Sequence, residues 1–205
     1  GKPFVGVEVT KGAAGWTYGT PVYWEKGYSY SFAAVAPTGA FAMETAPAAY
    51  KDYGTISFVN ESGEKDLVYA TKDCGLVTWK NDACPDAVHL TFNHMLSRVR
   101  FQFMNLMDDN SEIYISDVKI ADACGNGTAV LKETFGDLAW VNGDAKTNYT
   151  FGIGANYFAK NVADTTEHKY MIPVTLTTEA PYNYKVTFTV YRKHAGGIVD
   201  TYNHT

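Results

Sequence analysis

The stretch from Ala87 to Leu106, AVHLTFNHMLSRVRFQFMNL, constrains the fold more than any other part of the sequence. It alternates apolar and polar residues, as a β-strand with one buried face does. Its apolar residues lie at even positions in the first half and at odd positions in the second: Val88, Leu90 and Phe92, then Val99, Phe101 and Phe103. Because side chains along a strand alternate with a period of two, the change requires an insertion between Asn93 and Arg98. We expect a bulge or a single turn there, with His94 at the kink bonding a backbone carbonyl.

The same alternation recurs over most of the chain. We expect further strands over residues 5–9, 28–32, 55–59, 113–120, 170–178 and 184–193. The composition agrees, because 15 tyrosines and 11 phenylalanines in 205 residues suit pleated strands. The segment GNGT at 125–128 predicts a hairpin turn, since Asn-Gly tolerates positive φ. Strand follows strand with few helical candidates, which predicts an all-β, antiparallel sandwich.

Length and charge exclude several classes of function. A chain of 205 residues fits one large all-β domain, and we expect a single domain over 1–205. The net charge is −5 and the 17 basic residues are scattered, so the basic stripe of a nucleic-acid-binding protein is missing. No apolar run approaches the roughly 20 residues that a membrane-spanning helix needs. We therefore expect neither a nucleic-acid partner nor a membrane span.

The three cysteines pose a pairing question. Cys74, Cys84 and Cys124 have no CxxC spacing and no Cys/His cluster around them, so the sequence predicts no metal site. A Cys74–Cys84 disulfide would close a short loop in an oxidising compartment, and Cys124 would then be unpaired. The other interpretation, which we favour, is that all three cysteines are unpaired.

Catalytic and cofactor motifs are missing from the sequence. It contains no Gly-x-Ser-x-Gly elbow, and the GIG at 152–154 lacks the third glycine of a dinucleotide site. The DDNSE segment at 108–112 lacks the order of a calcium loop. No carboxylate or nucleophile lies at a spacing that would make His94 a base, so we assign it a structural role. We expect a protein that is not an enzyme and that uses no cofactor.

Aromatic residues offer one candidate ligand site. Trp24 and Trp79, with neighbouring tyrosines, would form a platform on which sugar rings stack. That arrangement would make the protein a surface glycan-binding module. Aromatic residues at alternating strand positions more often belong to a core, which is the interpretation that we favour.

Three blocks of sequence, taken in order, carry a family resemblance. The first is YWEKGYSYSFAAVAP at 23–37. The second is DLVYA at 66–70 followed by VHLTFNHMLSRVRFQF at 88–103, and the third is ISDVKI at 115–120 with YMIPV at 170–174. Together they resemble the fimbrillin-like (Mfa-like) family of bacterial surface fimbrial proteins, over about residues 23–190.

The resemblance implies a transthyretin-like β-sandwich with Greek-key-type connections and a place in a fimbrium at the cell surface or outer membrane. It implies export as a lipoprotein precursor with a lipid anchor. Subunits of this kind assemble by strand exchange, in which a strand of the next subunit replaces a displaced one. The leading segment with Val5, Val7 and Val9 is the candidate for displacement. A host surface protein or a glycan would be the target of adhesion.

Two features depart from the family pattern. Processing in the family commonly follows an arginine, whereas the three arginines here, Arg98, Arg100 and Arg192, lie far from the start. The alternatives are cleavage at a lysine such as Lys11 and no cleavage at all. Family members also usually carry a second sandwich domain or a closing C-terminal strand, and we expect that such a C-terminal part is missing from the present sequence, which stops at TYNHT in mid-pattern.

The predicted core follows from the strand pattern. Its members are the large apolar residues that share a face in the expected strands: Tyr30, Phe32, Leu90, Phe92, Leu96, Val99, Phe101, Phe103, Ile115, Val118, Ile120, Val186, Phe188 and Val190.

Overall fold

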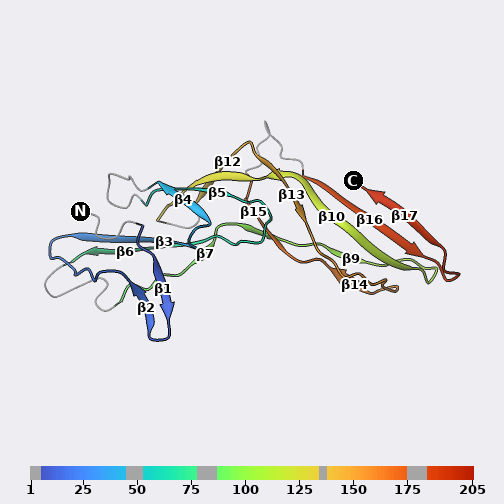
Figure 1. Cartoon of the computed structure of the whole chain (residues 1–205), viewed down its shortest axis with the longest axis horizontal. Coiled ribbons are helices and arrows are strands. Elements are labelled where there is room, and N and C mark those ends of the chain that lie inside the picture. The colour runs from blue at the N-terminus through green and yellow to red at the C-terminus, as the bar shows by residue number, and fades with distance from the viewer. Residues whose placement is uncertain (1–5, 45–52, 78–86, 134–137, 175–183) are drawn as a thin grey trace. The chain divides into compact units, whose positions relative to one another are not determined.

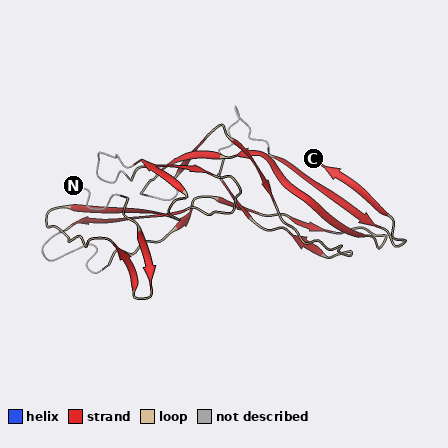
Figure 2. Ribbon diagram, viewed as in Figure 1, coloured by secondary structure: helices blue, strands red, loops and turns tan. Residues whose placement is uncertain are grey.

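All the regular structure that we describe is β-strand. The computed structural model describes residues 6–44, 53–77, 87–133, 138–174 and 184–205. Figure 1 labels the strands of these residues where there is room, and Figure 2 shows that none of the described residues is drawn as helix. The strands form several antiparallel sheets in a sandwich-like arrangement, which confirms the predicted all-β class. Among the described residues no helix is long and apolar enough to cross a membrane.

The chain divides into two compact units, and each unit draws on three separate stretches of sequence. Unit 1 comprises Gly1–Phe58, Leu67–Met95 and Thr128–Val141. Unit 2 comprises Val59–Asp66, Leu96–Gly127 and Asn142–Thr205. The chain therefore passes between the units several times. A single domain over 1–205 stays a prediction.

Unit 1 contains the first strands of the chain and two strands from its middle. They are β1 (Val9–Gly12), β2 (Gly15–Tyr18), β3 (Ser29–Ala36), β4 (Phe41–Glu44), β5 (Thr55–Val59), β6 (Val68–Leu76), β7 (Asn93–His94), β11 (Asn126–Val130) and β12 (Ala139–Asn142). One sheet has the order β3-β6-β7 and another the order β12-β11-β5-β4. Alternate residues of β5, Ile56 and Phe58, are buried, and so are Leu67 and Tyr69.

Unit 2 is built around one larger sheet. Its strands are β8 (Ser97–Val99), β9 (Gln102–Met104), β10 (Glu112–Cys124), β13 (Lys146–Thr150), β14 (Ala163–Thr165), β15 (Lys169–Met171), β16 (Lys185–Lys193) and β17 (Val199–His204). The larger sheet has the order β13-β10-β16-β17, and two short pairs, β14-β9 and β15-β8, accompany it.

The core of unit 2 lies on one face of this sheet. The fully or almost fully buried members of the core are Ile113, Ile115, Val118, Ile120, Ala123, Tyr149, Phe151, Phe158 and Met171. Partly buried residues of the neighbouring strands pack against them, including Val99, Phe101, Phe103, Val186, Phe188 and Val190. Most of the predicted core residues in this part of the chain therefore lie in or against the observed core.

Strand β10 keeps its apolar residues buried by means of two irregularities. Its buried positions change from odd, at Ile113 and Ile115, to even, at Val118 and Ile120. The register with β16 shifts between Ser116 and Lys119, where Asp117 has φ 53°. The register with β13 shifts after Ile120, where Asp122 has φ 55°. Aspartate tolerates the left-handed region of backbone conformation better than most residues. At each bulge the irregularity turns the side chains that follow it back toward the core.

The break predicted between Asn93 and Arg98 is present, but it is a change of partner. Strand β7 pairs with β6, whereas β8 pairs with β15 and β9 pairs with β14. The consecutive residues Met95 and Leu96 are both buried at the point where the chain passes from unit 1 to unit 2. The prediction that Phe92 belongs to the core is wrong. Phe92 is 43% exposed. Residues 87–92 form no strand, so they belong to no sheet that would turn their alternate side chains toward a core.

The hairpin predicted at 125–128 is also wrong. Strands β10 and β11 follow one another with only Gly125 between them, yet they belong to different sheets. Neither Asn126 nor Gly127 has the positive φ that an Asn-Gly hairpin turn needs. A Cβ on Gly125 would lie 3.3 Å from the Ala145 carbonyl oxygen and from Cβ of Thr147. Glycine here permits close packing instead of a reversal of the chain.

The cysteines differ from the interpretation that we favoured. Cys74 is disulfide-bonded, so the three cysteines are not all unpaired. Cys84 lies outside the described residues. Cys124 is a free, buried thiol whose Sγ lies 3.1 Å from the carbonyl oxygen of Asn126. Because Cys124 is buried among strand residues, its role is that of a small apolar residue of the core.

Candidate binding surfaces

A two-stranded hairpin, β1–β2, presents the most exposed aromatic residues at the start of the chain. Directly opposite residues of an antiparallel pair share a face. Val9 lies opposite Tyr18 and Lys11 lies opposite Trp16, so these four residues form one face, which we call the hairpin face. Thr10 and its partner across the hairpin lie on the other face, where their hydroxyl oxygens are 3.2 Å apart.

The hairpin face is open to solvent. Trp16 is 66% exposed, Val9 49% and Tyr18 44%. The Lys11 ammonium lies 5.8 Å from the centroid of the Trp16 ring, within the range of a cation–π contact. Both strands pair only with each other among the described residues. An isolated hairpin of this kind is marginally stable, so little holds it in place.

The candidate displaced strand falls partly on this hairpin. Val5 lies outside the described residues. Val7 precedes the first strand and is exposed, and Val9 is the first residue of β1. The strand expected over 5–9 therefore begins only at Val9, and in the part described its apolar residues are not buried.

Of the two tryptophans predicted to form a sugar platform, Trp24 makes aromatic contacts with its neighbours. Its ring meets Tyr30 at 4.7 Å and Phe32 at 5.8 Å between centroids, both in edge-to-face geometry. The Tyr30 hydroxyl accepts a hydrogen bond of 2.8 Å from the Glu25 backbone N–H. Trp79 lies outside the described residues. Among the tryptophans that the structure describes, Trp16 is the exposed one. The segment KGAAGW, with two glycines in a short loop, is the signal that would have found its hairpin.

His94 lies where the chain leaves unit 1. It is the last residue of β7, it pairs in register with Val68, and its side chain is exposed. The following residue, Met95, donates its backbone N–H to the Leu67 carbonyl over 2.7 Å. A structural role for the His94 ring at this crossing stays a prediction.

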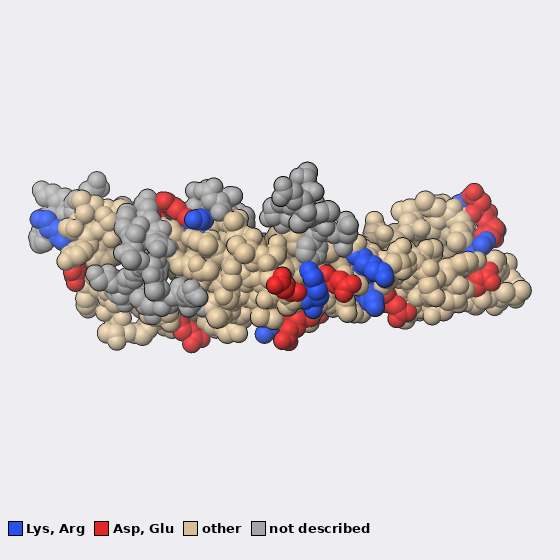
Figure 3. Space-filling model, turned by 90° about the horizontal axis from the view of Figure 1, so that it is seen from above, with Lys and Arg blue, Asp and Glu red and all other residues tan. Residues whose placement is uncertain are grey.

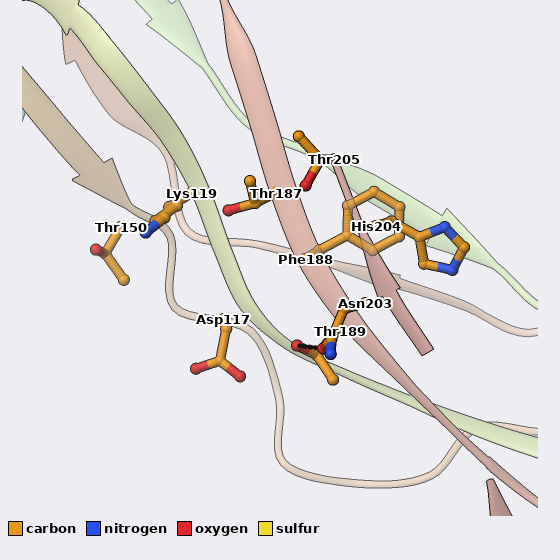
Figure 4. A pocket seen from close by; sticks show the side chains of 9 residues that line it. All are labelled: Asp117, Lys119, Thr150, Thr187, Phe188, Thr189, Asn203, His204 and Thr205. Carbon is orange, nitrogen blue, oxygen red and sulfur yellow. Dashed lines mark hydrogen bonds between the residues drawn. The ribbon is translucent and has the colours of Figure 1, made fainter. Parts of the chain in front are cut away.

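The outer face of the larger sheet of unit 2 carries a hollow of about 300 Å³. Figure 4 shows the side chains around it, which come from β10, β16, β17 and the end of β13. Polar side chains of these strands line it, and we call this group the polar hollow: Asp117, Lys119, Thr150, Thr187, Thr189 and Asn203. Phe188, His204 and Thr205 also line it. Strand register brings these residues together, because Lys119 lies opposite both Thr150 and Thr187 and Thr189 lies opposite Asn203.

Ion pairs tie the 108–112 segment to β16, and a separate pair links His194, just after β16, to β17. Arg192 pairs with Asp109, and its Nε donates to the Ser111 hydroxyl over 3.2 Å. Hydrogen bonds from Ser111, through its side chain and its backbone, and then from Arg192 lower the pKa of Asp109 to about 2. Asp200 lies 2.7 Å from Nε2 of His194, and this hydrogen bond lowers the pKa of the Asp200 carboxyl.

The lowered pKa of Asp109 predicts a loss of stability in acid. A carboxylate whose pKa falls on folding stabilises the folded state above its unfolded pKa, and that contribution disappears as the pH falls through the folded pKa. The stability difference between wild type and Asp109→Asn should therefore shrink as the pH falls from about 4 to about 2. Urea unfolding midpoints measured at about pH 6, 4, 3 and 2, which span the expected range, check this prediction.

Ser111→Ala serves as the matched variant for this experiment. It removes the largest cause of the lowered pKa while leaving the Asp109–Arg192 pair in place. Its difference from wild type should shrink over the same pH range. An equal stability difference for Asp109→Asn at pH 6 and pH 2 would show that this carboxylate is not held charged in the folded state.

Charged side chains do not gather by sign on the face of the molecule drawn in Figure 3, where lysines and arginines lie among aspartates and glutamates. Within the described residues, no group of three or more His, Cys, Asp or Glu side chains is arranged to hold a metal ion.

Comparison with known proteins adds one match. The family model described as fimbrillin-like matches residues 3–204, nearly the whole chain of 205 residues. No curated protein and no solved structure matches the chain. The match extends the resemblance carried by the three blocks to both ends of the sequence. The chain belongs to the fimbrillin-like family.

Proposed function

We propose that the protein is a non-enzymatic subunit of a bacterial cell-surface fimbria and that it joins neighbouring subunits by strand addition. The match of the fimbrillin-like family model over residues 3–204 carries this proposal. The family is a structural one, and membership in it supports an association with other fimbrial subunits at the cell surface. Adhesion to a host protein or glycan, a lipid anchor in the precursor, location at the outer membrane and a transthyretin-like topology belong to the same proposal.

The end strand of the larger sheet supports strand addition. Strand β17 lies at one end of the order β13-β10-β16-β17 and pairs only with β16 among the described residues. An end strand presents a row of backbone N–H and C=O groups to which an incoming strand bonds. Most of the side chains of β17 are exposed, so they leave room for such a strand.

The leading segment supports the role of an exchangeable strand. Val9 and the rest of β1 pair only with β2 among the described residues, and all four residues of the strand are exposed. Displacing β1 would break the hairpin without removing a buried side chain of β1 from the core of unit 1. Backbone hydrogen bonds to a sheet of another subunit would replace those lost to β2.

Limited digestion tests the proposal. The protein is treated with a lysine-specific protease and run on a denaturing gel without boiling. We expect a ladder of detergent-resistant oligomers after digestion, because cleavage at the exposed Lys11 frees the segment that precedes it. Lys11→Gln should remain monomeric, whereas Lys26→Gln, which removes another exposed lysine of unit 1, should still form the ladder.

A wild-type protein that stays monomeric after cleavage at Lys11 would contradict assembly through this segment. A ladder that also forms with Lys11→Gln would keep strand addition but move the exchanged segment elsewhere. Mass spectrometry of the digested monomer identifies the bond that was cut and so separates these two results.

A further inference from the structure

A polar cluster lies at the turn that joins β16 to β17. The His194 backbone closes this turn, because its N–H donates to the Ile198 carbonyl over 2.9 Å and its carbonyl accepts from the Gly197 N–H, also over 2.9 Å. The His194 side chain reaches across to β17, where Nε2 lies 2.7 Å from Oδ2 of Asp200. His194 therefore links the two strands through both its backbone and its ring.

The cluster contains charged groups from β16, β17 and the 108–112 segment. Arg192 lies opposite Asp200 in the register of the two strands, and it pairs with Asp109. The Tyr202 hydroxyl donates to Oδ2 of Asp200 over 3.3 Å. The Asp200 carboxylate is thus the point at which the turn, the end of β16 and the side chains of β17 meet.

The charges of this cluster do not balance while the histidine is neutral. Its two carboxylates carry two negative charges and its guanidinium carries a single positive charge. Alternation along β16 places Lys193 on the opposite face of the sheet, where it pairs with Glu112 at 3.2 Å. Protonation of His194 would supply the missing positive charge directly beside Asp200.

Histidine is the side chain of this cluster that ordinarily changes charge near neutral pH. Hydrogen bonds from Ser111 and then from Arg192 hold the pKa of Asp109 at about 2, and the hydrogen bond with His194 lowers the pKa of Asp200. Both carboxylates are therefore charged throughout the range from about pH 5 to about pH 8, in which tyrosine and arginine side chains also keep their charge.

We propose that the His194–Asp200 contact is a pH-sensitive clasp that holds the end strand β17 to its sheet more firmly in acid. Below about pH 6 the protonated ring forms an ion pair with Asp200. As the pH rises, the ring loses its proton and one negative charge of the cluster is left over. A proton that the closed hairpin binds more tightly than the open one stabilises the closed form at low pH, and this contribution is lost as the pH rises. The clasp acts within one subunit, so it does not depend on strand addition.

Amide hydrogen exchange of the whole chain, followed by mass spectrometry at about pH 5.5 and about pH 8, tests this inference. The rates are divided by those of an unfolded peptide at the same pH, so that only the protection by structure is compared. We expect the protection of β17, relative to that of β13 in the same sheet, to be about two- to fivefold greater at the lower pH, as for a partly exposed ion pair.

Three variants assign the effect to one side chain. His194→Asn keeps a hydrogen-bond donor but takes up no proton, so the difference between the two pH values should disappear. Asp200→Asn should also remove it, since the protonated ring then meets no carboxylate. His204→Asn is the matched control, because it removes the other histidine of the hairpin, whose ring stacks on Phe188 with centroids 5.0 Å apart. It should retain the difference found in wild type.

Equal relative protection of β17 at the two pH values in wild type would overturn the inference. A difference that survives in His194→Asn would do the same. A difference that is lost in His204→Asn and kept in Asp200→Asn would place the pH sensitivity at the second histidine and so contradict the clasp. Exchange of the β13 amides in the same samples shows whether each variant is folded.

Discussion

Alanine in place of Tyr149 is expected to lower the free energy of unfolding by about 3–5 kcal/mol, as deletion of a buried aromatic ring does. Tyr149 lies in β13 at 0% exposure within the core of unit 2. Its hydroxyl donates to the Cys124 carbonyl over 3.2 Å. Gly63 packs directly on the ring, since a Cβ there would lie 2.9 Å from Cδ1 of Tyr149. Neighbours held this closely leave little room for collapse, so the cavity would persist.

Urea denaturation of the purified chain measures this loss. Tyr149→Phe separates the ring from its hydroxyl and should cost about 1 kcal/mol, because the hydrogen bond to the Cys124 carbonyl is lost. Val141→Ala, at a residue that is 65% exposed, should change stability by less than about 0.5 kcal/mol. If Tyr149→Ala unfolded within 1 kcal/mol of wild type (about the cost of the lost hydroxyl), the assignment of Tyr149 to the core would be wrong.

The second large effect is expected at Asn105, a polar residue that is 1% exposed. Its Nδ2 donates to the carbonyl oxygens of Ser111, at 2.8 Å, and Phe158, at 3.1 Å. Its Oδ1 accepts from the Met107 backbone N–H at 3.0 Å. Asn105→Ala leaves the Ser111 carbonyl and the part-buried Met107 N–H without this partner, while the Phe158 carbonyl keeps its bond from the Ile113 N–H. We expect a loss of about 2–4 kcal/mol, since each unsatisfied group costs about 1–3 kcal/mol and partial relaxation recovers some of it.

The same chemical denaturation experiment checks this prediction, with two comparison variants. Asn105→Asp keeps the acceptor for Met107 but sets carboxylate oxygens against two carbonyl oxygens, so it should destabilise at least as much as Asn105→Ala. Gln102→Ala, on the neighbouring strand at an exposed position, should change stability by less than about 0.5 kcal/mol. Equal stability of Asn105→Ala and Gln102→Ala would mean that the buried amide contributes nothing.

Regular alternation in the sequence predicted strands well where one face meets a core. The pattern of residues 55–59 became β5 with unchanged bounds, and that of 184–193 became β16, which begins one residue later at Lys185. The change of parity after Phe92 located the break in the chain, although it could not show that the break is a change of sheet. That distinction depends on partners distant in sequence, such as β15 for β8.

Backbone conformation was harder to predict than burial. Nothing in IYISDVKI shows that Asp117 adopts positive φ, because aspartate also fits an exposed position in a regular strand. Asn-Gly at 126–127 is a hairpin signal in many chains, but here close packing around Gly125 decides the conformation. In both places tertiary contacts overrule a local preference, which a single sequence does not reveal.

The polar hollow could not have been predicted, because its members come from four strands and meet only through strand register. Lys119 and Thr187 become neighbours because the β10 bulge shifts the pairing with β16. The hairpin face could have been predicted, since Trp16 follows a short glycine-containing loop after an alternating segment. The sugar platform at Trp24 and Trp79 was predicted from the density of aromatic residues around them and not from their exposure.

The division of each unit over three stretches of chain bears on how the protein is made and exported. A chain that emerges with its N-terminal end first cannot complete unit 1 before Val141, and unit 2 needs residues that follow it. Early segments therefore lack their partners for much of synthesis, and long-range strand pairing is slow even afterwards. Such a chain stays unfolded, and so can pass through a translocation pore, for longer than a chain whose first domain folds early.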